Sequence, residues 1–556
     1  MTFRVERLVF KNGPKGTDAP LTLEPSQITL FIGPNNGGKS RAIFEIRNAL
    51  THDSFIDDLV LNLVSYREIT RQEVDEKIES LKTDRIEGDH ASEDYLPLII
   101  QGERSIIHLP SLHHGLADPN KTGSSRRELY KLMLGSFTSN LDGVNRLTLT
   151  EPKPGQRRDG KAKTTIAKLF ADPTLLQKLT AIFFKAFGRY LVIDPTEMVQ
   201  LSYRIANTEP IDGVQFSLSD PSQEFFRDTQ PVKSASDGTK AFTGIMAEII
   251  SGEKEVFFID EPEAFLHPSL AGILGTEISR NLGRTSQLFV ATHSPEFLLG
   301  CVASGKQIDV VRLTYDGSLG TAQLLHKDQL KKLFHDPLLR SADVVSGLFH
   351  GGAVVVEADN DRAFYGEIFH RLTSSEDVRA RNVRFMNAQN KQTMPSISEF
   401  LRSMGVPAAM IFDLDWIKED GEVCRKYLSG ALIPQGLWDG FRNQRSAIRS
   451  TLEVANPDYK RAGGLRNLTG DDLASASAFL DTMEEYGIFT VRSGELESWL
   501  PQLAVGRNKN GWVPRIFEAM GSDPEDPNYI KPDADDVWNF IRRVNAWISR
   551  PDRKGM

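Results

Sequence analysis

The 556-residue sequence has only two cysteines, Cys301 and Cys424, which excludes a disulfide framework and a four-cysteine zinc site. Such scarcity is typical of a reducing compartment, so we expect a cytoplasmic protein. Long apolar runs are missing, and the first residues carry charges where a secretory signal has an apolar core, which argues against membrane and secreted classes. Positive charge is not in excess either: the net charge is −9. Bulk charge therefore does not predict nucleic-acid binding, although a local basic surface would permit it.

The sequence does contain a glycine-rich loop between a strand pattern, residues 28–32, and a helix pattern, residues 41–50. The loop matches G-x-x-x-x-G-K-S, whose glycines let backbone N–H groups face phosphates. Lys39 would reach the β- and γ-phosphates, and the Ser40 hydroxyl would bind Mg²⁺. The predicted nucleotide-binding residues here are Gly33, Asn35, Asn36, Gly37, Gly38, Lys39 and Ser40.

Two further strand patterns end in residues suited to ATP hydrolysis. The apolar run 256–259 ends in Asp260 and Glu261, which predicts a magnesium-binding acid followed by a general base. The run 288–291 is followed by Thr292-His293-Ser294, and we expect His293 to contact the γ-phosphate. Taken alone, His293 would instead be interpreted as an ordinary loop histidine.

A serine and a glycine precede a helix pattern before Asp260. Ser236 is a good N-cap, and the free amides of its helix would bind an anion. Ser236 and Gly238 suggest the opposed-dimer site of ABC-type ATPases, in which the serine of one subunit contacts the phosphate held by the other; an ordinary capped helix is the alternative. The segment from Asp260 to Pro268, DEPEAFLHP, resembles that of ABC-like ATPases related to the heads of structural-maintenance-of-chromosomes proteins.

The long interval between the loop and Asp260 predicts a helical insertion at residues 51–170, with a dimerisation role as one reading. Within it, residues 152–164 are rich in lysine, arginine, proline and glycine, which is typical of an exposed loop. Contact with a nucleic-acid backbone is one interpretation and a solvated surface loop is the other.

Acidic residues follow several strand patterns in the C-terminal half. Alternating strand and helix patterns predict a parallel sheet with helices on both faces, in which ligands gather at the carboxyl ends of the strands. A crevice of carboxylates needs cations, and hard oxygen ligands suit Mg²⁺ or Mn²⁺. We expect two such ions, which would activate a water and stabilise the leaving oxygen of a phosphodiester. Ordinary helix-capping acids are the alternative. The acids placed at this edge are Glu357, Asp361, Asp413, Asp415 and Glu497.

The pattern E-x-x-x-D after one strand and D-x-D after another resembles a Toprim domain. An ABC-type ATPase followed by Toprim is the layout of the OLD (overcoming lysogenization defect) endonucleases, whose relatives include the Gabija nuclease subunit and some retron effectors. The resemblance implies metal-binding roles for the acids listed above, with Glu357 and Asp413 also catalytic, and a catalytic lysine for which Lys509 is the expectation; Glu495 competes with Glu497. One residue departs from the pattern: Toprim usually has glycine where this chain has Ala358, whose methyl would crowd either a metal or the backbone turn.

We therefore predict an α/β protein with an ABC-type ATPase domain at residues 1–345 and a Toprim nuclease domain with a C-terminal helical extension at 346–556. ATP and Mg²⁺, or Mn²⁺ at the Toprim site, are the expected cofactors. DNA, a second copy of the chain and a defence-system partner such as a helicase are the expected partners. The alternative is an ATP-driven DNA-binding scaffold whose Toprim domain does not cut. A topoisomerase lacks a placed tyrosine nucleophile, and a primase lacks zinc-ribbon cysteines.

Overall fold

The protein divides into two compact units, residues 1–334 and 335–556, near the domain boundary expected after residue 345. The computed structural model describes residues 4–14, 19–51, 59–67, 70–89, 92–100, 103–110, 136–155, 162, 164–210, 214–326, 328–329, 336–337, 339, 342–375, 382–507 and 511–556. Both units combine helices with parallel sheets, which confirms the predicted α/β class. None of the helices in these ranges has both the length and the apolarity of a membrane span.

A six-stranded sheet with the order β15-β14-β3-β13-β12-β7 forms the centre of the first unit. Neighbouring strands run parallel except in the antiparallel β14–β15 pair. Strands β3 and β13 are buried along their whole length, as their continuous apolar sequences require of strands covered on both faces. In chain order the strands are β3 Ile28–Ile32, β7 Thr138–Leu141, β12 Val256–Asp260, β13 Gln287–Ala291, β14 Ile308–Tyr315 and β15 Gly320–Leu325.

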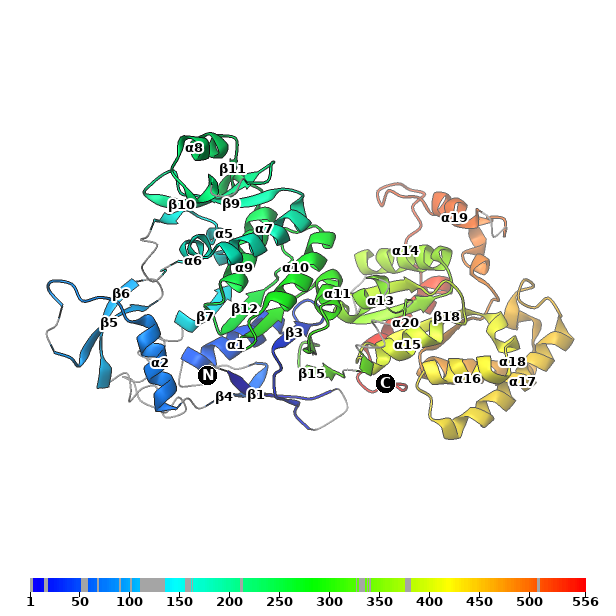
Figure 1. Ribbon diagram of the computed structural model, residues 1–556. Helices are drawn as coiled ribbons and strands as arrows, with labels where there is room; N and C mark the ends of the chain where they lie inside the picture. The colour runs from blue at the N-terminus through cyan, green and yellow to red at the C-terminus, as the bar shows by residue number, and fades with distance from the viewer. Residues whose placement is uncertain are drawn as a thin grey trace. The chain divides into compact units, whose positions relative to one another are not determined.

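Four described helices cover this sheet, and three of them follow one of its strands (Figure 1). Three of them start at side-chain or proline signals: Ser236 caps α9, and prolines open α10 and α11. Because α1, α10 and α11 follow β3, β12 and β13, their N-termini lie at the same edge of the sheet as these strand ends, whereas α9 precedes β12. These helices are α1 Lys39–Thr51, α9 Asp237–Ser251, α10 Pro268–Asn281 and α11 Pro295–Ala303.

Smaller sheets and helices complete the first unit. The antiparallel sheet β2-β1-β4 contains β1 Val5–Phe10, β2 Thr22–Leu23 and β4 Leu61–Tyr66. Strands β4 and β7 fall within residues 51–170 and yet belong to the unit's own sheets, so the described insertion between them is α2 Arg71–Leu81, β5 Tyr95–Ile100 and β6 Glu103–His108. The remaining elements are β8 Lys153–Pro154, β9 Tyr190–Asp194, β10 Gln200–Ala206, β11 Gln230–Pro231, α5 Asn145–Thr148, α6 Thr165–Ala171, α7 Pro173–Phe187 and α8 Asp220–Arg227.

The second unit is built on the parallel sheet β17-β16-β18-β19, with strands β16 Gly352–Val356, β17 Val383–Asn387, β18 Ala408–Asp413 and β19 Ile488–Val491. Alternate strand residues such as Val354 and Ile411 enter a core shared with α14, α19 and α20. The intervening residues, such as Val355 and Met410, are also fully buried, so helices cover both faces as predicted. The helices are α13 Ala342–Ser346, α14 Asp359–Ser375, α15 Met394–Ser403, α16 Gly421–Gly430, α17 Trp438–Ala455, α18 Gly470–Glu485, α19 Trp512–Met520 and α20 Asp536–Ser549.

Candidate nucleotide site and carboxylate cluster

The register of the central sheet places the motifs of the first unit at one edge. Asp260 pairs with Ala291 across β12 and β13, and Ala291 pairs with Phe31 across β13 and β3. The glycine-rich loop, the acids after β12 and His293 therefore follow neighbouring strand ends. This is the edge at which parallel sheets bind ligands.

Two glycines of the loop have a geometry that other residues would not tolerate. Gly33 has a φ of +133°, and a Cβ there would overlap the carbonyl oxygen of Leu313. Gly38 has a φ of +92°. Asn36 also has a positive φ, 61°, which asparagine accepts more readily than most residues. The loop is thus wound tightly enough for its amides to face an anion.

The two polar side chains that end the loop are held by neighbours. Lys39 Nζ donates to the carbonyl oxygens of Gly33 at 3.0 Å and Pro34 at 2.7 Å. Burial lowers the pKa of Lys39 to about 8, although nearby carboxylates, Glu261 first, favour its charged form. Ser40 Oγ donates to Asp260 Oδ1 at 2.9 Å. A hydroxyl and a carboxylate at this separation are suitable ligands for the Mg²⁺ of a bound nucleotide.

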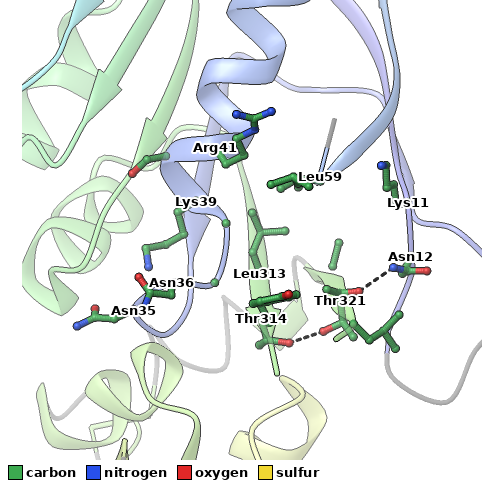
Figure 2. Close-up of a pocket in the computed structure, with 18 of the residues that line it drawn as sticks. Lys11, Asn12, Asn35, Asn36, Lys39, Arg41, Leu59, Leu313, Thr314 and Thr321 are labelled. Carbon is green, nitrogen blue, oxygen red and sulfur yellow. Dashed lines mark hydrogen bonds between the residues drawn. The ribbon is translucent and has the colours of Figure 1, made fainter. Parts of the chain in front are cut away.

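A cavity of about 1170 Å³ opens beside this loop. Its volume exceeds the roughly 300–1,000 Å³ of most small-molecule sites, so a nucleotide has room there. Figure 2 shows Lys39, Asn35 and Asn36 on one side of the cavity and Lys11 and Asn12 on the other. The second wall is braced by hydrogen bonds, from Asn12 Nδ2 to the Gly320 carbonyl at 2.9 Å and between the Thr314 and Thr321 hydroxyls at 2.5 Å.

Glu261 and His293 face each other at the rim of this site. His293 Nε2 lies 3.3 Å from Glu261 Oε1, and both side chains are partly exposed, by 33% and 47% respectively. Burial and the nearby Lys39 lower the pKa of His293, so the imidazole is neutral near pH 7. The backbone N–H of His293 donates to Glu263 at 2.6 Å, and burial raises the pKa of that carboxyl. The loop after β13 is thus fastened to the acidic loop after β12.

Arg146, which the sequence analysis did not single out, holds the acidic loop after β12 through hydrogen bonds to its backbone; this contact is called the clamp below. This residue of α5 is 2% exposed, and its Nη1 donates to the carbonyl oxygen of Asp260 at 3.2 Å and to that of Glu261. Glu261 has a φ of 51°, a left-handed conformation that costs a non-glycine residue about 1–2 kcal/mol. The clamp therefore holds the predicted general base in an unfavourable backbone conformation. No motif surrounds Arg146, so sequence spacing offered no signal.

Ser236 and Gly238 lie at the start of α9. Ser236 is exposed, and its Oγ accepts a hydrogen bond from the Thr239 N–H at 3.3 Å, as predicted for an N-cap. Gly238 is buried, and a Cβ there would overlap the carbonyl oxygen of Phe265 in the loop after β12. The glycine therefore allows the helix start to pack against the acidic loop. The opposed-dimer role of Ser236 stays a prediction.

In the second unit, carboxylates follow neighbouring strand ends. Glu357 follows β16, and Asp413 ends β18, where it pairs with Val491 of β19. Asp361 lies in the first turn of α14, and its Oδ2 accepts a hydrogen bond from the Ala358 N–H at 3.1 Å. Burial and then the charges of Asp413 and Glu357 raise the pKa of Asp361 to about 7. Burial and the charges of Asp413 and Asp415 also raise the pKa of Glu357, so these predicted acids affect one another electrostatically.

Lysines that the sequence analysis missed face the second pair of acids. Lys460 Nζ lies 2.9 Å from Asp413 Oδ2 and 2.9 Å from Asp415 Oδ2. Lys391 Nζ lies 3.6 Å from Asp415 Oδ2 and closer, at 2.9 Å, to Glu419. Burial alone would lower the pKa of Lys460, but the two aspartates outweigh it and raise the value. A lysine far along the chain, in a turn without strand or helix periodicity, gives no sequence signal.

Three of the four remaining residues singled out in this unit, Glu497, Glu495 and Ala358, lie in the described part of the chain. Glu497 is 9% exposed. Burial raises the pKa of the Tyr365 hydroxyl, and the charges of Asp361 and Glu497 raise it further. Its competitor Glu495 is also buried. Ala358 is not among the residues with a positive φ, so the backbone here does not require the glycine usual in Toprim domains. Lys509 lies outside the described residues.

The donor set of this cluster fits a hard divalent cation in its chemistry. Its ligands would be carboxylate oxygens, which Mg²⁺ and Mn²⁺ prefer. Burial, and then the charges of neighbouring carboxylates, raise the pKa values of Glu357 and Asp361, and a cation would favour their charged forms. In the described part of the chain, no group of three or more His, Cys, Asp or Glu side chains is arranged as a metal site. The aspartates are arranged around Lys460 instead.

The fold and the two sites define a P-loop ATPase joined to a carboxylate-bearing parallel-sheet unit, and comparison with protein families agrees. Residues 140–299 match the family described as "AAA domain, putative AbiEii toxin, Type IV TA system". Residues 348–415 match the TOPRIM domain of overcoming lysogenization defect protein-like sequences. The chain therefore carries an AAA-type ATPase domain followed by an OLD-like Toprim domain, as the sequence resemblance predicted. Comparison with curated proteins gives no match.

Solved structures that resemble the chain include heads of Smc proteins. An Smc head bound to the C-terminal winged-helix domain of ScpA is 13% identical, with a TM-score of 0.36 over 58% of this chain and 99% of that one. An Smc head from Pyrococcus furiosus with an extended coiled coil, bound to the C-terminal domain of ScpA, is 11% identical, with a TM-score of 0.36 over 60% and 98%. The SMC head domain from Thermotoga maritima is 14% identical, with a TM-score of 0.29 over 58% and 98%.

Proposed function

We propose that this protein hydrolyses ATP and cleaves DNA with a divalent metal ion, as an endonuclease of OLD type. The observation that carries the nuclease proposal is the set of acids at one edge of the second sheet. Glu357 follows β16, Asp413 ends β18, and Asp361 and Asp415 lie within four residues of them along the chain. Burial and the charges of neighbouring carboxylates raise the pKa values of Glu357 and Asp361, and a divalent cation would stabilise these two acids in their charged form.

For ATP hydrolysis, we assign a role to each polar group of the first site. Lys39 and the loop amides would neutralise the phosphates, and Ser40 with Asp260 would hold Mg²⁺. Glu261 would accept a proton from the attacking water as the bond to the γ-phosphorus forms and the bond to the β–γ bridging oxygen breaks. His293, neutral near pH 7, would donate a hydrogen bond to the γ-phosphate.

For DNA cleavage, Glu357, Asp361, Asp413 and Asp415 would hold Mg²⁺ or Mn²⁺. The bound ion would lower the pKa of water and stabilise the leaving oxygen. Water attacks the phosphorus, the bond to one ester oxygen breaks, and the departing oxygen takes up a proton. We also include Glu497 and Lys509 in the nuclease site, as the OLD resemblance implies. Two described lysines contact the acids: Lys460 lies 2.9 Å from Asp413 and Asp415, and Lys391 lies 3.6 Å from Asp415.

We further propose that two chains pair through their ATPase units, with Ser236 of one chain completing the nucleotide site of the other. The exposure of Ser236 at the start of α9 supports this pairing. Nucleotide state would then control access to the nuclease site. A cytoplasmic role in anti-phage defence, with a helicase or another partner as in Gabija or retron systems, rests on family analogy. A neighbouring gene for a helicase or a reverse transcriptase would test that role.

The second candidate function is an ATP-driven DNA-binding scaffold whose Toprim domain does not cut, and Ala358 is the observation in its favour. The ordinary backbone conformation of Ala358 weakens it. A plasmid assay with purified protein separates the two functions. We expect nicked or linear product in Mg²⁺ or Mn²⁺, changed by ATP and abolished by a chelator. A protein that shifts DNA in a gel but never cuts it, in either metal and any nucleotide state, would establish the scaffold.

A further inference from the structure

The ammonium group of Lys460 occupies the position between Asp413 and Asp415. Its two distances to Oδ2 atoms, both 2.9 Å, are those of charge-assisted hydrogen bonds. The side chain is 19% exposed and the two aspartates are 15% and 24% exposed, so solvent screens these pairs less than it screens surface pairs. A positive charge is therefore already built into one half of the acid cluster.

The backbone holds Lys460 in this place. Gly494, with a φ of +116°, follows β19, and a Cβ there would overlap the carbonyl oxygen of Lys460. Gly494 in turn accepts a hydrogen bond from the N–H of Leu414, the residue between the two aspartates, at 2.8 Å. Gly464, with a φ of +64°, approaches Arg492 in the same way. The turn with Lys460, the turn after β19 and the loop of the acids thus form one packed unit.

We propose that the ammonium group of Lys460 takes the place of one of the two metal ions of a two-metal nuclease, so that this acid cluster binds a single divalent ion. That ion would be held on the side of Glu357 and Asp361, with Asp413 shared between it and Lys460. An ammonium group and a divalent ion repel each other and compete for the same oxygens, so Lys460 excludes a second ion from the Asp413–Asp415 pair. This inference rests on the proposed nuclease function and specifies how many divalent ions its site binds.

Lys391 provides a matched comparison, because it is also a lysine beside Asp415. It lies farther from that carboxylate, at 3.6 Å, and its closer partner is Glu419 at 2.9 Å. Removing its charge should therefore leave the Asp413–Asp415 pair occupied by Lys460. The two lysines have the same chemistry and differ in position, so the pair of variants separates a specific effect from a general change in charge.

The test counts Mn²⁺ ions bound to the nucleotide-free full chain, by following free Mn²⁺ with electron paramagnetic resonance. The ions bound at the cluster are the difference between a given protein and a variant in which all four acids are neutralised, by Glu357→Gln, Asp361→Asn, Asp413→Asn and Asp415→Asn. We expect one ion for the wild type, two for Lys460→Met, and one for both Lys460→Arg and Lys391→Met. Thermal unfolding of each variant checks that it is folded.

Each outcome bears on a different proposal. Two ions in the wild type, or a single ion in folded Lys460→Met, would overturn the role given to Lys460 and leave the metal-dependent nuclease standing. No difference between the wild type and the variant with all four acids neutralised would overturn both proposals, since the cluster would then bind no metal. If Lys460→Met does not fold, Lys460→Gln removes the charge while keeping a polar side chain: two bound ions would support the role given to Lys460, and one would overturn it.

Discussion

The clamp on the acidic loop predicts that Arg146→Met slows ATP hydrolysis from outside the nucleotide site. Arg146 donates to the carbonyl oxygens of Asp260 and Glu261, and Glu261 is held at a φ of 51°. Methionine keeps much of the side-chain length and removes both donors. The loop is then released to relax toward an ordinary backbone conformation, which moves the carboxylate of Glu261 away from the attacking water.

The magnitude follows from the cost of that conformation. A left-handed non-glycine residue is about 1–2 kcal/mol less favourable, so the fraction of chains with Glu261 in place falls by roughly 5–30-fold if Arg146 alone offsets this cost. The kcat for ATP should fall by about the same factor. The KM should change less, because the phosphate contacts come from the glycine-rich loop. Arg146→Lys keeps a charged donor and should lie between the wild type and Arg146→Met.

Steady-state ATP hydrolysis and thermal unfolding measure this directly. Arg280→Met is the matched control, since Arg280 is an exposed arginine on α10 of the same unit and should leave kcat unchanged. A folded Arg146→Met protein with the wild-type kcat would refute the reasoning. It would mean that the conformation of Glu261 does not depend on the clamp, or that Glu261 is not the base.

Other changes at the nucleotide site have equally definite outcomes. Glu261→Gln should keep ATP binding but stall hydrolysis, since an amide cannot accept the proton; hydrolysis at the wild-type rate would show that the base is elsewhere. Gly33→Ala should weaken nucleotide binding more than about tenfold in a titration, because its Cβ would overlap the Leu313 carbonyl; unchanged affinity would show that the loop adapts. Lys39→Ala should abolish ATP hydrolysis. Mixing Lys39→Ala chains with Ser236→Arg chains should restore part of the hydrolysis, and a mixture that hydrolyses no more ATP than either variant alone would contradict the pairing.

The sequence predicted which motif residues lie at the carboxyl edge of each sheet, because this prediction needs only the order of apolar runs and polar residues along the chain. A continuous apolar run such as 256–259 predicts a parallel strand, and the acid that follows must then lie at the carboxyl edge beside the loop after β3. The same reasoning placed Glu357 and Asp413 at the ends of neighbouring strands in the second unit. Both family comparisons agree with the predicted order of domains.

The residues that the sequence did not reveal act through tertiary contacts. Arg146 donates hydrogen bonds to the backbone carbonyl oxygens of Asp260 and Glu261. Every residue has such a carbonyl, so the sequence of the loop does not indicate its partner. Lys460 contacts Asp413 because the turns with the positive-φ residues Gly464 and Gly494 pack closely against each other. The positions of these turns along the chain follow no regular spacing that a sequence pattern could reveal. Residues 51–170 were expected to form an insertion, but β4 and β7 within them pair with strands of the first unit. Pairing between distant strands cannot be read from local patterns.

The most direct test of two separate chemistries in one chain measures ADP release and DNA cleavage in the same reaction mixture. We predict that Asp413→Asn removes cleavage and keeps ATP hydrolysis near the wild-type rate, because Asp413 lies in the unit that does not contain the glycine-rich loop. Asp472→Asn, which changes an exposed acid of α18 in the same unit, should keep both activities. Cleavage by Asp413→Asn at the wild-type rate would contradict the assignment of the nuclease site to this carboxylate cluster.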